Sequence, residues 1–353
     1  MSNRTAFIAE RHLTVADDEI QIPLEILEPK LASALRRAGL SEPIARIIAE
    51  TVAGAEIDGS RSHGIHRLPG YVSSISSGWI NTAAKPACEQ TRPGCLAVEA
   101  DNGFAQQATR AFSNRLAGMA RSQGVATMFV RNSHHFGALW QDVEPLARAG
   151  LISIAMVNSR SHMAVWQGKR KTLGTNPIAF ACPRTNAPPL VWDQASSIMS
   201  HGDILLHAAA GRPVPSGVGI NRDGDVTTDP AAILDGGALL PFGGAKGASL
   251  AFMAEVLVAA LSGGTFGFED CSSNFPGAKT SNAGQFILAL DPGAGGNASF
   301  QGQLERLIAE LKHAGSTRMP ADNRYRRRQA VHESGMLSVD ARNWARVLSL
   351  AED

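Results

Sequence analysis

The sequence predicts an α/β protein with a mostly helical domain built from both ends of the chain. Apolar, β-branched runs typical of buried strands alternate with helical segments through the middle of the chain. Both ends carry apolar residues at helical spacing. The 353 residues, 44% of them hydrophobic, suffice for sizeable cores without a disulfide or metal. We expect a helical or mixed domain at 1–122 plus 303–353 and an α/β domain at 123–302.

The first two elements are expected to be helices, because 25–38 and 42–58 repeat Leu, Ile and Val every three or four residues. Ser41 is a plausible N-cap with Pro43 in the first turn, and Gly59 should end the second helix.

Further along, helical and strand patterns alternate. The apolar spacing predicts helices at 70–78, 105–122, 137–149, 204–211, 247–262 and through 303–353. Short apolar runs predict strands at 124–133, 151–159, 177–183, 190–193 and 284–291. A hairpin around Asp223-Gly224 is expected at 218–227.

Composition narrows the class of protein. The 33 Lys and Arg nearly balance the 32 Asp and Glu, which argues against electrostatic binding of nucleic acid or an anionic membrane. No apolar run approaches the ~18 residues of a membrane span, and the N-terminal MSNRTAFIAERHLTV lacks the apolar core of a secretory signal. The four cysteines form no CxxC pair. We expect a cytoplasmic protein with a small-molecule substrate.

Several familiar motifs are missing. No GxGxxG follows a strand, so a Rossmann dinucleotide fold is unsupported; GVGINR at 217–222 lacks the third glycine. HExxH and GxSxG are absent too, and no metal site is expected.

Two polar clusters contain histidine. Ser62-His63 with Arg67 offers an imidazole for proton transfer and a guanidinium for a carboxylate, although a capped helix start with a surface histidine has the same pattern. RNSHHFGA at 131–138 follows a strand, where α/β sheets bind ligands, and is also compatible with a structural turn.

Two further clusters are turn-rich. LGTNPIAF at 173–180 and WDQASSIMSHGD at 192–203 combine small hydroxyl residues with Asp203, which could orient a histidine or simply cap a helix. FGGAKGASL at 242–250 could present backbone N–H groups to an anion, or could be a tight entry to a buried helix. Glu255 inside that helix is expected to be an isolated polar residue.

Taken in order along the chain, these strings resemble the malate/L-lactate dehydrogenase family of NAD(P)-dependent oxidoreductases. The resemblance rests on SHGIHRLPGYVSSISSGWIN (62–81), RNSHHFGA, GTNPIAF, DQASS and LDGGALLPFGGAKG (234–247), and it extends from about residue 12 to 350. It implies the family's non-Rossmann NAD(P)-binding fold, a mixed sheet flanked by helices, and a homodimer.

The resemblance also implies roles for individual residues. Ser62, His63 and Asp203 would form the proton relay, Arg67 and Thr175 would bind the substrate, and His201-Gly202 would border it. In some relatives the histidine matching His135 is the proton donor instead, so His63 and His135 compete for this role. Cofactor contacts would come from His135, Phe136, Gly137, Ala138, Leu139, Asp193, Gln194, Ala195, Gly244, Ala245, Met319, Pro320, Ala321, Asp322, Asn323, Arg324 and Tyr325.

Two departures from the family pattern affect the expected cofactor contacts. Ala245 stands where relatives often carry histidine, and MPADNRY (319–325) lacks a glycine common in the family. NADPH, with NADH as the alternative, would need a cation at the 2′-phosphate; Arg160 and Arg324 are the candidates.

Within the family, HGD (201–203) combined with LDGGALLPFGG is most similar to members that reduce cyclic ketimine acids with NADPH. The implied reaction converts Δ1-piperideine-2-carboxylate to L-pipecolate, Δ1-pyrroline-2-carboxylate to L-proline, or both. The alternatives are a 2-hydroxy acid dehydrogenase acting on malate, lactate, ureidoglycolate or sulfolactate, and a non-catalytic nucleotide-binding protein.

Overall fold

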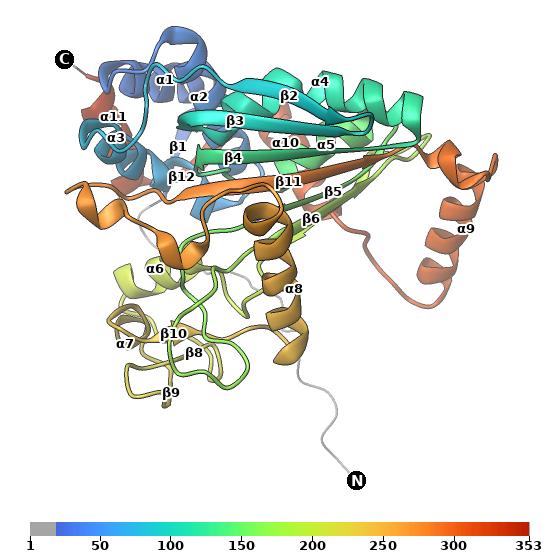
Figure 1. Cartoon of the computed structure of the whole chain (residues 1–353). Coiled ribbons are helices and arrows are strands. Elements are labelled where there is room, and N and C mark those ends of the chain that lie inside the picture. Colours follow the sequence, from blue (N-terminus) through green and yellow to red (C-terminus); the bar gives the residue numbers. More distant parts are fainter. Residues whose placement is uncertain (1–18, 353) are drawn as a thin grey trace.

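A computed structural model describes residues 19–352, and its centre is a seven-stranded mixed sheet (Figure 1). The strand order is β2-β3-β4-β11-β5-β6-β7. Only β3 and β4 run parallel, and the other neighbours are antiparallel. The expected α/β fold with a mixed sheet is confirmed. The strands are β2 (Ala87–Arg92), β3 (Cys95–Phe104), β4 (Val125–His134), β5 (Ile152–Val157), β6 (Ile178–Cys182), β7 (Leu190–Gln194) and β11 (Asn282–Leu290).

Helices cover both faces of this sheet. On one face, α4 (Ala105–Gln123) and α5 (Trp140–Arg148) bury a core that includes Leu116, Val143 and Leu146. On the other, α8 (Ala245–Glu255) and its π-helical continuation Val256–Ala260 pack Val258 against Met156 and Phe286 of the sheet. The predicted helix 247–262 is thus confirmed in position, with a change of helix type in its second half.

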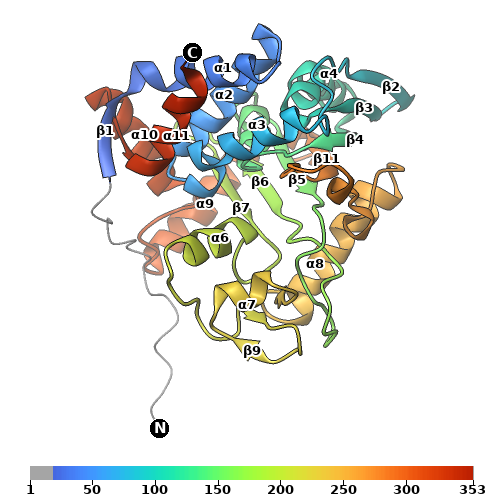
Figure 2. The ribbon, with the colours of Figure 1, turned by 90° about the vertical axis from the view of Figure 1, so that its left-hand side faces the viewer.

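The two ends of the described chain pack together, as Figure 2 shows for the blue and red elements. Strand β1 (Glu19–Pro23) pairs antiparallel with β12 (Met336–Asp340). The helices α1 (Leu27–Arg37), α2 (Glu42–Ile57), α3 (Leu68–Ser76) and α11 (Ala341–Ala351) bury one shared hydrophobic core beside them.

The expectation of helix throughout 303–353 was wrong at β12. This segment lies between α10 (Asp322–Ser334) and α11, and α9 (Phe300–His313) precedes them. MLSVD is too short for its alternating burial to stand out, and its hydrogen-bonding partner β1 lies some 300 residues away in sequence. Residues 87–104, placed by sequence with the terminal helices, supply two strands of the central sheet. The division into two domains stays a prediction, and the N-terminal segment MSNRTAFIAERHLTV lies outside the described residues.

A smaller unit lies below the central sheet in the view of Figure 1. It contains the three-stranded sheet β10-β8-β9 and two short helices, α6 (His201–Ala209) and α7 (Pro230–Leu234). Strands β8 (Gly219–Ile220) and β9 (Val226–Thr227) are antiparallel, which confirms the predicted hairpin, and β10 (Ala238–Leu239) pairs with β8. Within residues 19–352, no helix has the length and apolar character needed to cross a bilayer.

The carboxyl group of Asp142, in the first turn of α5, makes stability pH-dependent. Burial raises its pKa to about 6, and the side chains of Gln285 and Thr109 only partly oppose this by hydrogen bonding. A carboxyl whose pKa is raised on folding stabilises the protein below its unfolded pKa of about 3.9 and loses that contribution as pH rises through 6. We expect Asp142→Asn to stabilise the protein by roughly 1–3 kcal/mol at pH 7.5 and by clearly less at pH 4.5, where most of the folded protein still has this carboxyl protonated. Urea unfolding at both pH values measures this, and an equal effect at both would contradict it.

Candidate active site

The turn after α2 places the first histidine cluster. The chain leaves α2 through Gly59, at φ +81°, and passes through two 3₁₀ turns, Arg61–His63 and Ile65–Arg67, into α3. The buried carboxylate of Glu56 accepts a hydrogen bond of 2.9 Å from the Ile65 N–H. His63 is therefore held in a recessed turn, and the interpretation of it as a surface histidine was wrong.

Arg67 lies at the centre of the cluster. Its Nε donates to the Ser62 carbonyl at 2.6 Å, and burial lowers the pKa of its guanidinium while nearby Asp203 opposes that shift. A Cβ on Gly202 would lie 2.9 Å from Arg67 Nη2 and 3.0 Å from Ser62 Cβ. The start of α6 can therefore approach the guanidinium only because residue 202 is glycine.

Asp203 is not the cap of α6. Ser200 occupies the N-cap position, and its hydroxyl accepts from the Asp203 N–H at 3.1 Å. The carboxylate of Asp203 acts on Arg67, whereas the shift in the pKa of His63 has contributions from burial, Arg67 and His66. The placement of Asp203 as a member of the proton relay stays a prediction.

Two imidazoles lie near the guanidinium, and the rings of His63 and His135 are centred 6.2 Å apart. Burial, followed by the charge of Arg67, lowers the pKa of His63 to about 3 and that of His135 well below its usual range. Ser62 Oγ lies 3.2 Å from Nδ1 of His63. Both rings are thus neutral at physiological pH, and this cluster unites two motifs that lie about 70 residues apart in sequence.

Tyr71 completes the cluster, and the sequence analysis missed it. Its hydroxyl lies 2.5 Å from Nδ1 of His135, and the Gly137 N–H also donates to that nitrogen, at 3.3 Å. Two donors on Nδ1 leave the proton of the neutral ring on Nε2. The available signal was its spacing: Tyr71 follows Arg67 by four residues at the start of a helix, which puts both on one face.

Replacing Tyr71 by phenylalanine tests this positioning role. The variant keeps the ring that packs against Phe104, with 5.3 Å between centroids, and removes only the hydroxyl. We expect kcat to fall about 10-fold with KM within about twofold, because the tautomer of His135 is no longer fixed while Arg67 stays intact. Steady-state kinetics measures the split; a rise in KM at constant kcat would contradict the assignment.

His201 lies beside a second unpredicted residue, His162. Their rings are stacked at a centroid distance of 3.7 Å. Burial and then Arg160 and Arg67 lower the pKa of His201 to about 3. Arg160 is therefore close to His201 and Arg67, the residues expected at the substrate, and its assignment to a 2′-phosphate stays a prediction.

Thr175 lies at the junction of the central sheet and the smaller unit that contains α6 and α7. Its carbonyl accepts from both the N–H and the hydroxyl of Ser196, each at 2.8 Å. The next residue, Asn176, donates to Glu255 at 3.0 Å, as does Asn158. The expectation that Glu255 is isolated was wrong, because its buried carboxylate ties two strand ends to α8.

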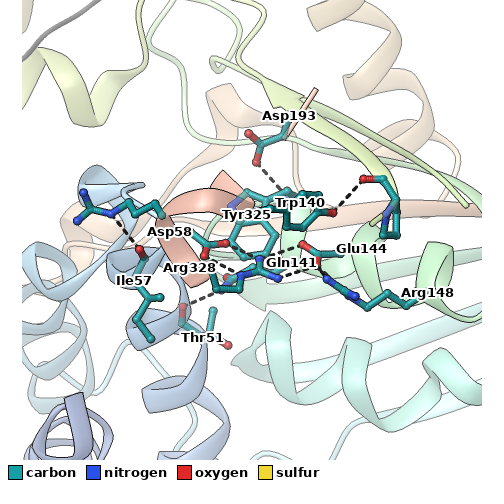
Figure 3. Close-up of polar contacts among 12 residues, drawn as sticks. Thr51, Ile57, Asp58, Trp140, Gln141, Glu144, Arg148, Asp193, Tyr325 and Arg328 are labelled. Carbon is teal, nitrogen blue, oxygen red and sulfur yellow. Dashed lines mark hydrogen bonds and ion pairs between the residues drawn. The ribbon is translucent and has the colours of Figure 1, made fainter. Parts of the chain in front are cut away.

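The predicted cofactor segments converge at the start of α5 (Figure 3). Oδ2 of Asp193, in β7, accepts from the Trp140 N–H at 3.0 Å. Arg324 lies over the Trp140 ring at 4.5 Å, and the hydroxyl of Tyr325 donates to the Pro189 carbonyl at 3.0 Å. Residues 135–140, 193 and 324–325 therefore form one cluster. The remaining predicted residues of the last segment, Met319, Pro320, Ala321, Asp322 and Asn323, lead into α10, where the Met319 N–H donates to Asp322.

The other predicted cofactor segments meet at the start of α8. The Phe242 N–H donates to the Ser196 carbonyl at 3.0 Å, which brings Gly244-Ala245 close to Gln194-Ala195 at the end of β7. A Cβ on Gly247 would lie 2.5 Å from that carbonyl, so the tight entry to a buried helix is real. Gly244 has φ +61° and no atom within 4 Å of a built Cβ, so its backbone is exposed at the N-terminus of α8.

These clusters fit a dinucleotide. Arg324 Nη1 and Trp140 Nε1 are buried without a hydrogen-bond partner among the described residues, and both lie beside Asp193. Buried hydrogen-bond donors normally have acceptors, so a bound ligand that accepts from these two N–H groups would explain why they lack partners. Within residues 19–352, no group of three or more His, Cys, Asp or Glu is arranged to hold a metal ion.

A guanidinium close to two neutral imidazoles, next to a cluster that fits a dinucleotide, is the arrangement expected of an α/β oxidoreductase outside the Rossmann class. Residues 22–348 match the family described as malate/L-lactate dehydrogenase, and the chain belongs to that family.

Its relatives include several ketimine reductases. The Δ1-pyrroline-2-carboxylate/Δ1-piperideine-2-carboxylate reductase of Pseudomonas putida is 44% identical over 317 residues, which is 90% of this chain and 93% of the relative. The crystal structure of Δ1-piperideine-2-carboxylate reductase from Pseudomonas syringae pv. tomato superposes with a TM-score of 0.90 at 42% identity, covering 94% of this chain and 99% of that one. A (2R)-3-sulfolactate dehydrogenase (NADP(+)) of Chromohalobacter salexigens is 37% identical over 89% of this chain and 93% of its own.

Proposed function

We propose that the protein reduces cyclic ketimine acids, Δ1-piperideine-2-carboxylate to L-pipecolate and Δ1-pyrroline-2-carboxylate to L-proline, with NADPH. The observation that carries the proposal is the Arg67 guanidinium close to the neutral rings of His63 and His135. The similarity to relatives that reduce these two ketimines, over nine-tenths of the chain, supports the same substrate class.

Arg67 is the group that binds the substrate carboxylate. A guanidinium can hold a carboxylate through two parallel N–H···O bonds, which fixes both position and plane. Because Nε of Arg67 is already bonded to the Ser62 carbonyl, the two Nη atoms remain for the substrate. The anchored carboxylate would turn one face of the ring toward the cofactor.

The neutral imidazoles favour an imine over an oxo acid. The nicotinamide supplies a hydride when bound. A protonated cyclic imine already carries the proton that its nitrogen needs, whereas a 2-oxo acid must receive one from the enzyme at the carbonyl oxygen. The imidazole of His63, with a pKa of about 3, and that of His135, with a pKa well below its usual range, hold no extra proton at neutral pH and do not repel a cationic ring. Hydride addition to the protonated imine gives a neutral secondary amine, which then takes up a proton from water, and His63 or His135 serves as a hydrogen-bonding group at the ring nitrogen.

NADPH is the cofactor that we infer, with Arg324 as the residue for the 2′-phosphate. Its Nη1 is buried without a described partner, and its guanidinium is stacked on Trp140. A relative at 37% identity is named as NADP(+)-dependent. Contacts to the cofactor by the remaining residues of 135–139, 193–195, 244–245 and 319–325 belong to the same proposal.

We also propose a cytoplasmic homodimer. The support for self-association is an apolar surface near α8, where Phe252 and Trp166 are each more than half exposed and contact each other edge to face. Exposed apolar groups that cluster are typical of interfaces.

A substrate panel tests the function. Oxidation of NADPH is followed with both cyclic imines, pyruvate and oxaloacetate at equal concentration. We expect kcat/KM for a cyclic imine to exceed that for either oxo acid by at least 100-fold. Faster turnover of the open-chain oxo acids would assign the protein to the 2-hydroxy acid dehydrogenases instead, and binding of NADPH without turnover of any of them would indicate a non-catalytic protein.

A further inference from the structure

A cleft of about 810 Å³ opens beside the substrate-binding cluster. His201 lines it next to Gly202, the residue that contacts Arg67 and Ser62. The charged part of the wall is formed by Arg160, Lys171 and the carboxyl group of Asp270, and the imidazoles of His162 and His201 also line the cleft. Apolar side chains from α6, α7 and the 267–278 segment form the rest, among them Ile204, Leu234 and Phe275.

The cleft offers more room than the proposed reaction needs. Pockets of about 300–1,000 Å³ hold ligands of drug size, whereas Δ1-piperideine-2-carboxylate is a single six-membered ring with one carboxylate. Arg160 and Lys171, which add to the effect of burial in lowering the pKa of His201, line the cleft together with it.

The wall of this cleft carries two positive groups, Arg160 and Lys171, against one carboxylate. Burial, and then His201, Arg160, Lys171 and Arg67, depress the pKa of His162. Asp270 is the carboxylate that lines the cleft, and it accepts a hydrogen bond from the Ser272 hydroxyl. Asp203 acts on Arg67. Among the described residues, neither Arg160 nor Lys171 forms an ion pair.

We propose that this cleft is a subsite for a second anionic group on the substrate, bound by Arg160 and Lys171 while Arg67 binds the α-carboxylate. The inference rests on the proposed function, since it takes the ketimine acid as the part of the ligand that reacts. The substrate class becomes cyclic imino acids that carry a further carboxylate or comparable anion. The stacked pair His162–His201 forms the neutral surface between the two anion sites.

Matched substrates test the subsite directly. The full-length enzyme is assayed with NADPH on Δ1-piperideine-2-carboxylate and on the same ring carrying a second carboxylate at C6. We expect the dicarboxylate to be reduced with a kcat/KM at least equal to that of the monocarboxylate. Arg160→Gln should lower the ratio of dicarboxylate to monocarboxylate kcat/KM about 10-fold, and Lys171→Gln should lower it in the same direction.

Arg170→Gln is the matched control, because it removes the same charge from an exposed neighbour that does not line the cleft. That variant should leave the ratio unchanged. Inhibition by pyridine-2-carboxylate and pyridine-2,6-dicarboxylate provides a second measurement that needs no turnover; the ratio of the dicarboxylate's inhibition constant to that of the monocarboxylate is expected to rise in Arg160→Gln.

The outcomes are separable. If the monocarboxylate is reduced but the dicarboxylate is neither reduced nor a better inhibitor, the subsite is wrong and the proposed function stands. If all three variants lower the ratio equally, the cations act only by long-range attraction, and the subsite is again wrong. If neither imine is reduced, the proposed function itself fails.

Discussion

Replacing Arg67 by lysine is expected to lower kcat/KM for Δ1-piperideine-2-carboxylate by roughly 100- to 1,000-fold. Lysine keeps the charge but has neither the planar fork that binds a carboxylate through two bonds nor the Nε–H that donates to the Ser62 carbonyl. Both the ligand and the turn that carries His63 therefore lose a fixed contact. Arg67 holds the substrate carboxylate in both the ground state and the transition state. We therefore expect a large part of the fall in kcat/KM to appear as a higher KM.

Arg61→Lys is the control for this substitution. Arg61 belongs to the same turn, but its guanidinium pairs with Glu19 of β1 instead of lying in the site. Its replacement should change kcat/KM less than about threefold. Equal losses in the two variants would mean that Arg67 acts through the conformation of the turn, and the assignment of the carboxylate site would then fail.

The second large effect is expected in stability, on replacing Arg328 by alanine. Nε of Arg328 donates to Asp58 at 2.9 Å and Nη1 donates to Glu144 at 2.8 Å, so α10 is tied to both α2 and α5 (Figure 3). The side chains of Asp58 and Glu144 are only 1% and 4% exposed. Burial opposes the charge of Arg328, but its hydrogen bonds to these carboxylates raise the pKa of the guanidinium.

Removing one partner of a buried ion pair costs about 3–5 kcal/mol, because the remaining charge is buried without compensation. Glu144 retains Arg148, at 2.6 Å, so Asp58 is the carboxylate that loses its partner. We expect Arg328→Ala to lower the free energy of unfolding by about this amount, and the same change in an Asp58→Asn background to cost clearly less. Urea denaturation of the four proteins measures the cycle.

Arg326→Ala provides the comparison, since Arg326 is exposed and bonds only to Asn323 nearby in α10. We expect its cost to stay below about 0.5 kcal/mol. A similar cost for Arg326→Ala and Arg328→Ala, or an additive cycle, would show that the buried cluster does not hold α10 in place.

The parts of the fold that sequence predicts are those with a strong local signal. Helices such as α1 and α2 carry a long apolar stripe, and β4 and β11 are continuous buried runs. The short β1 and β12 have no such signal, because each is stabilised by a partner from the opposite end of the chain. Sequence spacing says nothing about which distant segments pair.

The residues of the site also divide into those that the sequence predicts and those that it does not. The motif around Ser62, His63 and Arg67 could be recognised because its residue types are unusual together. The order of this and the other motifs along the chain then carried the resemblance to a known family. Tyr71 and His162 were missed for a physical reason: each acquires its role from a ring that lies 64 or 39 residues away in sequence, His135 and His201 respectively. The sequence does not decide the side of Arg160 either, since the strand that precedes it does not reveal which side of the cleft its end faces.

The central claim is that the guanidinium of Arg67 lies close to two imidazoles that stay neutral, and nitrogen-15 NMR of the histidines measures their protonation most directly. Spectra recorded from pH 8 to pH 5 are assigned by comparison with His63→Gln and His135→Gln. We predict that the signals of both rings keep the shifts of neutral imidazole over this whole range, with the His135 proton on Nε2. Titration of either ring with a midpoint between pH 6 and 7 would contradict the account.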